Sequence, residues 1–157
     1  MAELVPKAEK FATILSEVVN GTVGRDVRFV VTPLVGPVEL AWVFAEGSTP
    51  TKVLPIAIVC GMPPGSPVLL WLRTWFLVRL DDPRKHLAVE RSAFALEIGE
   101  QNKRRPALRV EFDRDKGNEP DDLVAGKHRR SAAHVQIHGT SHELAYVQGI
   151  NRVLKIG

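Results

Sequence analysis

The chain has 157 residues, which is the length of one domain and enough to bury a core without disulfides or a structural metal. An apolar share of 45% and a charged share of 25% indicate a soluble globular protein, and a net charge of +3 is too small to indicate nucleic-acid binding by itself. The single cysteine, Cys60, excludes an internal disulfide and a cysteine-based metal cluster, so we expect a reducing, cytoplasmic setting.

The first expected element is an amphipathic helix over residues 3–20. Its apolar side chains recur at three- and four-residue spacing, at Leu4, Ala8, Phe11, Leu15 and Val18. Pro6 suits the first turn of such a helix, where its missing N–H costs nothing. Asn20 followed by Gly21 predicts the end of the helix, because glycine readily adopts the left-handed conformation that terminates helices.

The pattern then changes to alternation, which predicts strands over residues 27–32, 38–44, 53–59, 68–80, 86–98, 108–113 and 133–138. The third of these contains Pro55 and is expected at an edge or a bulge. Residues 68–80 and 86–98 predict a long hairpin. The most apolar window, 68–80, carries Arg73 and Arg79 and is too short to cross a bilayer as a helix, so we expect no membrane partner.

Residues 68–80 are expected to form the central strand, with one dry face. The even-numbered positions are apolar except for Thr74, whereas the odd-numbered positions combine Trp71 and Trp75 with two arginines. This second face suits either a platform on which nucleic-acid bases stack or packing under a helix, with an arginine stem lying across each tryptophan. We favour packing, because it is the commoner arrangement.

The last quarter of the chain predicts a long polar loop, a short strand and a closing helix. Residues 114–130 have little apolar content, and Gly139 ends the final strand. Thr140 and Glu143 match a capping box, after which the apolar stripe comprises Leu144, Val147, Ile150 and Leu154. We therefore expect a single α+β domain over residues 1–157: an N-terminal helix, an antiparallel meander of about six strands, and a C-terminal helix on one face.

Three of the five histidines fall between residues 133 and 143, and they are the candidate catalytic residues: His134, His138 and His142. In a straight strand His134 and His138 lie about 13 Å apart, too far to share a metal ion. His138 and His142 straddle the turn and, with Glu143, Glu111 or Asp113, could bind a divalent metal. Alternatively, they could flank an anion at the helix start and cleave RNA by acid–base chemistry. The structural alternative is the polar side of a strand followed by a helix cap, and it is slightly favoured.

Two basic clusters are candidates for contact with RNA or DNA. The first comprises Arg104 and Arg105, after Lys103, and the second comprises Lys127, Arg129 and Arg130 at the end of the polar loop.

Three segments, Leu87–Phe94, Leu108–Arg114 and Ala133–His138, resemble uncharacterised small actinobacterial α+β proteins. The resemblance covers about the second half of the chain and implies no functional residues. The order of an Arg-x-Glu strand followed by a His-rich strand is also similar to small toxins of toxin–antitoxin pairs.

Our leading hypothesis is a binding protein that acts through a protein partner or self-association, of the kind encoded with a mobile element or a toxin–antitoxin-like pair. It depends on the polar loop, the Trp/Arg face and the lack of a strong catalytic motif, and it requires no cofactor. The alternative is a small hydrolase that acts on phosphodiesters through residues 134–143, either RNase-like or metal-dependent. Binding of RNA or DNA through the basic clusters is a third hypothesis.

Overall fold

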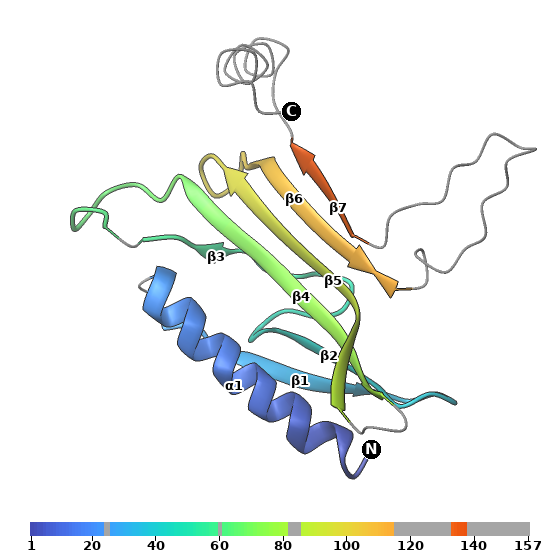
Figure 1. Ribbon diagram of the computed structural model, residues 1–157. Helices are drawn as coiled ribbons and strands as arrows, with labels where there is room; N and C mark the ends of the chain where they lie inside the picture. Colours follow the sequence, from blue (N-terminus) through green and yellow to red (C-terminus); the bar gives the residue numbers. More distant parts are fainter. Residues whose placement is uncertain (24–25, 60, 82–85, 115–132, 138–157) are drawn as a thin grey trace, which may run out of the picture.

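The computed structural model describes residues 1–23, 26–59, 61–81, 86–114 and 133–137. This part of the chain contains one helix, α1 (Leu4–Val23), and one antiparallel sheet. The seven strands of the sheet are β1 (Phe29–Leu34), β2 (Leu40–Ala45), β3 (Ile56–Ala57), β4 (Leu70–Asp81), β5 (His86–Ile98), β6 (Arg105–Asp113) and β7 (Ala133–Ile137). Figure 1 shows α1 alongside the β1–β2–β4 part of the sheet. The expected α+β class and N-terminal helix are confirmed, with seven strands instead of about six.

The strand order is β1-β2-β4-β5-β6-β7, so the expected meander is interrupted at one point. Strand β2 pairs with Leu77 and its neighbours on β4, whereas the two-residue β3 pairs with Trp71 and Leu72 farther along the same edge. Our expectation of a full strand over residues 53–59 is therefore wrong, because Pro55 shortens it to a fragment, as an edge position allows.

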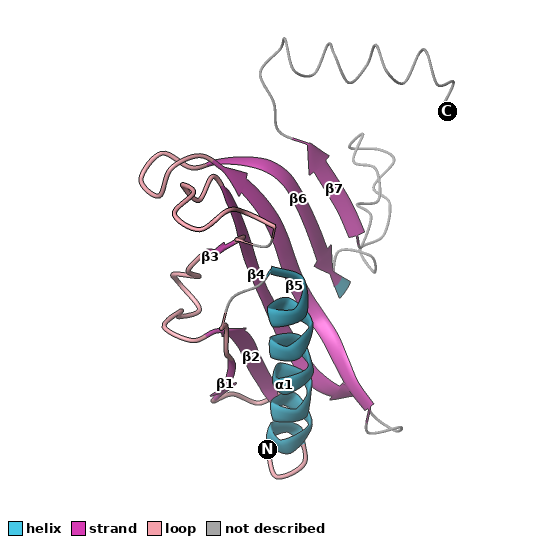
Figure 2. Ribbon diagram, turned by 90° about the vertical axis from the view of Figure 1, so that its left-hand side faces the viewer, coloured by secondary structure: helices cyan, strands magenta, loops and turns pink. Residues whose placement is uncertain are grey.

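The core lies between α1 and one face of the sheet (Figure 2). Leu4, Val43 and Val78 have no exposed surface in this layer. The even-numbered positions of β4 do face the core: Leu72 and Val78 are buried, and Thr74 donates a hydrogen bond from its hydroxyl to the carbonyl oxygen of Ala93 (3.0 Å). The predicted dry face of the central strand is confirmed.

The predicted end of the first helix is wrong by three residues. The side chain of Asn20, which was expected to stop the helix, instead accepts a hydrogen bond from the N–H of Val27 (2.7 Å) and donates one to its carbonyl oxygen (3.0 Å). The helix continues through Gly21 because Val23 packs into the core, 6% exposed. Burial of an apolar residue at the end of the helix outweighs the local preference for glycine as a terminator.

A β-bulge lies in the middle of the β4–β5 hairpin. Leu77 pairs with Arg91 and Val78 with Val89, so Glu90 is an extra residue on β5. A bulge reverses the side to which later residues point. Leu87 and Val89 before the bulge therefore share the core side of the sheet with Leu96 after it.

Several predicted features lie wholly or largely outside the described residues. These are most of the polar loop over residues 114–130, the turn after Ile137, and the closing helix over residues 140–154. In the described part of the chain, no helix is long and apolar enough to cross a membrane.

Candidate functional site

The histidine stretch is described only as far as β7. The register of the sheet places the backbone of His134 opposite Glu111 on β6, and His138 and His142 lie outside the described residues. The site formed by His138 and His142 therefore stays a prediction, because both histidines lie outside the described residues.

Asp113, the predicted metal ligand, lies at the end of β6 opposite Arg91. Its carboxylate is 15% exposed and forms an ion pair with the guanidinium of Arg91 (3.4 Å), while Glu111 pairs with Arg109. Among the described residues, no three histidine, cysteine, aspartate or glutamate side chains are grouped so that they could hold a metal ion. In this part of the chain, both carboxylates considered as companions of the histidines have arginine counter-ions.

The two described members of the basic clusters have different surroundings. Arg105 is exposed at the start of β6, while the Arg104 side chain is only 21% exposed. The guanidinium carbon of Arg104 lies 4.9 Å from the ring centroid of Trp71, and its Nε contacts the carboxylate of Glu97 (3.2 Å). Lys127, Arg129 and Arg130 lie outside the described residues.

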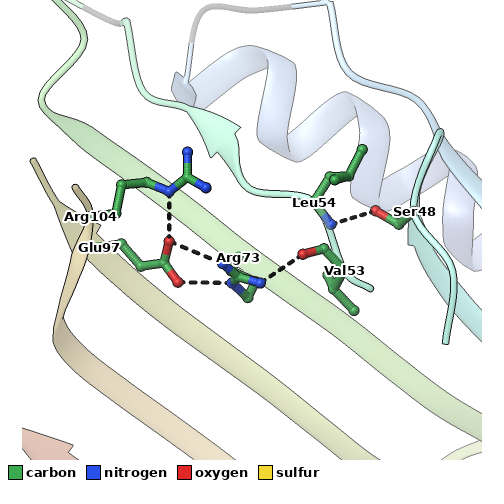
Figure 3. Close-up of polar contacts among 6 residues, drawn as sticks. All are labelled: Ser48, Val53, Leu54, Arg73, Glu97 and Arg104. Atoms are coloured by element: carbon green, nitrogen blue, oxygen red, sulfur yellow. Dashed lines mark hydrogen bonds and ion pairs between the residues drawn. The ribbon is translucent and has the colours of Figure 1, made fainter. Parts of the chain in front are cut away.

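Glu97 is the centre of a three-residue charge cluster on the sheet face opposite α1 (Figure 3). Its carboxylate accepts two hydrogen bonds from Arg73 (2.8 and 3.3 Å) and is 12% exposed. Arg73 also donates to the carbonyl oxygen of Val53 (2.8 Å), which ties the loop before β3 to β4. Because the two arginines share one carboxylate, the cluster carries a charge of +1.

A second charge cluster occurs at the bulge in the middle of the β4–β5 hairpin. The carboxylate of Glu90, the bulged residue, contacts Arg79 (2.5 Å) and Arg114 (3.3 Å). The first cluster fastens neighbouring strands together by charge-assisted hydrogen bonds, and the second does so by ion pairs. Their acidic partners already neutralise part of the positive charge, so this face is better suited to holding strands in register than to binding a polyanion.

The tryptophans of this face pack against side chains, but the helix that we expected to cover them is not found among the described residues. Arg104 lies over Trp71, whose indole N–H donates to the carbonyl oxygen of Gly99 (2.8 Å). Trp75 packs edge-on against Trp42, with ring centroids 4.8 Å apart. No helix of the described part covers this face, because α1 lies on the other side of the sheet.

The core side of the sheet continues beyond the area that α1 covers. Across three strands the register aligns Phe94 with Val110 and Val110 with Val135. Phe94 is 39% exposed and Val135 is 62% exposed, although both are on the side of the sheet that faces the core elsewhere. We call the surface formed by Phe94, Leu96, Leu108, Val110, Phe112 and Val135 the apolar shelf.

A groove of about 350 Å³ separates α1 from the start of β5. Its apolar lining includes Phe11 and Ile14 of α1 and Leu87 and Val89 of β5. Ile14 is 47% exposed, and Val18, one turn farther along the helix, is 55% exposed. The side of α1 that faces β5 therefore carries incompletely covered apolar residues next to Lys7 and Lys10, and we call Phe11, Ile14 and Val18 the apolar flank.

Sequence reasoning missed both the charge clusters and the shelf as surfaces. The reversal of the apolar pattern within β5, from Leu87 and Val89 to Phe94 and Leu96, is a signal for the bulge and hence for the side on which Phe94 lies. The pairing of Glu97 with Arg73 and Arg104 depends on strand register, which the sequence does not give.

No family model, curated protein or solved structure matches this chain.

Proposed function

We propose that this chain is a protein-binding module that holds an amphipathic helix on the apolar shelf. The observation that carries the proposal is the row formed by Phe94, Val110 and Val135 on the core side of the sheet, in which Phe94 and Val135 are exposed and Val110 is half-buried. Solvent-exposed apolar side chains that form a continuous patch typically mark interaction surfaces. The shelf spans three strands at about 4.8 Å spacing, so its width of about 10 Å suits one helix.

The charge of the groove between α1 and β5 supports a particular kind of partner. Lys10 lines this groove, beside the apolar flank. A partner helix with leucine, isoleucine or phenylalanine on one face and acidic residues along its edge would complement both features. Self-association through the shelf is the variant of this proposal in which the helix comes from another copy of the chain.

Cross-linking from two neighbouring positions of β7 tests this function. Val135 and Gln136 are both exposed, but adjacent strand residues point to opposite faces of a sheet. Each is replaced by cysteine in a Cys60→Ser chain, labelled with a benzophenone maleimide, and irradiated in the cells that express it. A discrete intermolecular product from Val135→Cys that Gln136→Cys does not give supports the function. Equal products from both positions, or none from either, contradict it.

A hydrolase that acts on phosphodiesters is our second proposal, and it depends on the backbone register that brings His134 opposite Glu111. The assay measures RNA cleavage with and without added divalent metal. Alanine at His134, His138 or His142 should abolish cleavage, whereas His86→Ala, an exposed histidine at the start of β5, should not. Equal activity of all four variants would exclude this proposal.

The expected C-terminal helix is also a proposal. Its apolar stripe, Leu144, Val147, Ile150 and Leu154, has the helical spacing that the shelf would accept.

A further inference from the structure

The two flanks of α1 differ in character. On the side that faces β1, a groove is lined by polar side chains of α1, among them Glu9, Thr13 and Asn20. On the side that faces β5, the exposed residues include Ile14 and Val18, together with Lys7 and Lys10. Exposed apolar residues on one side of a helix only are the expected arrangement when a second helix packs beside it on that side.

The apolar flank and the apolar shelf belong to one layer. Phe11 of the flank packs edge-on against Phe76 of β4, with ring centroids 5.3 Å apart. Phe76 pairs with Ser92 on β5, two residues before Phe94 of the shelf. In the described part of the chain the core cluster and the partly buried residues packed against it extend as far as Leu96 on β5, and they include no residue of β6 or β7. The layer that α1 begins is therefore incomplete over the last two strands.

The position at which β7 ends determines how the chain could complete this layer. Ile137 pairs with Leu108, and Leu108 with Leu96, so β7 ends at the end of the sheet that holds Leu72. Helix α1 ends there too, because the carbonyl oxygen of Val23 accepts a hydrogen bond from Val59, next to the pairing of β3 with β4. A segment that returns from Ile137 along the shelf would therefore run antiparallel to α1.

The lengths agree with such a return. Residues 138–143 can span about 20 Å when extended, which is ample for the step from the edge strand onto the shelf. Residues 144–154 would form a helix of about 16 Å. The shelf measures about 14 Å along β6 from Leu108 to Phe112. Within this segment the apolar residues Leu144, Val147, Ile150 and Leu154 fall on one helical face.

We propose that residues 144–154 of the same chain lie on the apolar shelf beside α1 and that a partner helix binds by displacing them. This inference rests on the proposed function, since it names the resident occupant of the same surface. Gly149 lies in the middle of the segment and weakens it as a helix, so the cover is suited to release. In the free protein residues 144–154 then cover the apolar shelf. A partner helix displaces them only if it packs on the shelf better than they do.

The test uses the full chain with benzophenone at Val135→Cys or Gln136→Cys, in the Cys60→Ser background, as a purified monomer. Irradiation from Val135→Cys should give intrachain products that map to residues 144–154, and Gln136→Cys should give none there. Adding Ile150→Glu removes an apolar contact and places a charge on the shelf. It should lower the yield of these products on the order of tenfold, while Gln148→Glu, outside the apolar stripe, should leave it unchanged.

The outcomes separate this inference from the proposed function. A synthetic peptide of residues 140–157, added in excess, should reduce the intrachain products if the cover exchanges. Intermolecular products from Val135→Cys with no labelling of residues 144–154, whether between two copies or to another protein, overturn the inference and uphold the function. If the yield of intrachain products falls neither with the peptide nor with any cellular protein, residues 144–154 do lie on the apolar shelf. That result overturns their displacement by a partner helix and, with it, the proposed function. Equal labelling of residues 144–154 from both positions overturns the inference.

Discussion

Replacing Glu97 by glutamine removes the charge that holds Arg73 and Arg104 together while it keeps the size of the side chain. The carboxylate accepts two hydrogen bonds from Arg73 and an ion pair from Arg104, and it is 12% exposed. A hydrogen bond to a charged group contributes about 1.5–3 kcal/mol, and the glutamine amide loses at least one of them. It also leaves two guanidinium groups without their shared counter-ion. Arg73 is 37% exposed, so solvent screening weakens these interactions. We therefore expect the substitution to lower the free energy of unfolding by about 2 kcal/mol.

The free energy of unfolding, measured by urea denaturation with tryptophan fluorescence, should therefore fall by about 2 kcal/mol in Glu97→Gln. For a domain of this size the melting temperature should fall by about 4–8 °C. Glu100→Gln is the matched control, because Glu100 is an exposed glutamate in the turn that follows β5. It should change the free energy of unfolding by less than about 0.5 kcal/mol. A loss in Glu97→Gln no larger than that of the control would refute the view that this carboxylate fastens β4 to β5 and to the turn.

Three further substitutions test the contacts around the sheet. Arg104→Ala removes the cation above Trp71, so acrylamide should quench the fluorescence of the indole more strongly. The free energy of unfolding should fall by about 1.5 kcal/mol, because the ion pair with Glu97 is also lost. Unchanged quenching would contradict the contact between Arg104 and Trp71. Gly99→Ala should cost about 2 kcal/mol in thermal unfolding, because Gly99 has a φ of 125° and an added Cβ would lie 2.6 Å from a backbone oxygen; a neutral result would show that the turn adapts. Asn20→Ala leaves the backbone of Val27 without its partner and should cost about 1–2 kcal/mol in urea, whereas Thr13→Ala, exposed on the same helix, should cost less.

The regular elements could be predicted because their apolar periodicity extends over long segments. The expected strand over residues 86–98 agrees with β5 at both ends, and the expected central strand agrees with β4 within two residues. Both strands present apolar residues to the core over a dozen positions, so one misplaced residue does not hide the pattern. The end of α1 differs from the prediction because the burial of Val23 and the hydrogen bonds between Asn20 and Val27 depend on tertiary contacts that local sequence signals do not show.

The candidate site was less predictable for a different reason. The histidines drew attention because they are chemically distinctive, whereas the shelf is made of residues that look like ordinary core. The sequence pattern of Phe94 and Val135 is that of buried positions, and the placement of α1 over the other half of the sheet leaves them exposed. Which half of a sheet face a single helix covers is decided by tertiary packing, and periodicity carries no information about it.

Strand β7, the edge strand that carries Val135 of the apolar shelf, is also the strand whose pairing costs the most chain entropy. Four residues separate β4 from β5, but nineteen separate the end of β6 at Asp113 from the start of β7 at Ala133. Closing the longer connection costs about 1.4 kcal/mol more, in return for a strand of only five residues. Strand β7 should therefore join the sheet last during folding and leave it first, on a timescale that amide hydrogen exchange can follow. Because Val135 lies on β7, detachment of this one strand would remove the outer wall of the shelf while the β4–β5 hairpin stays intact.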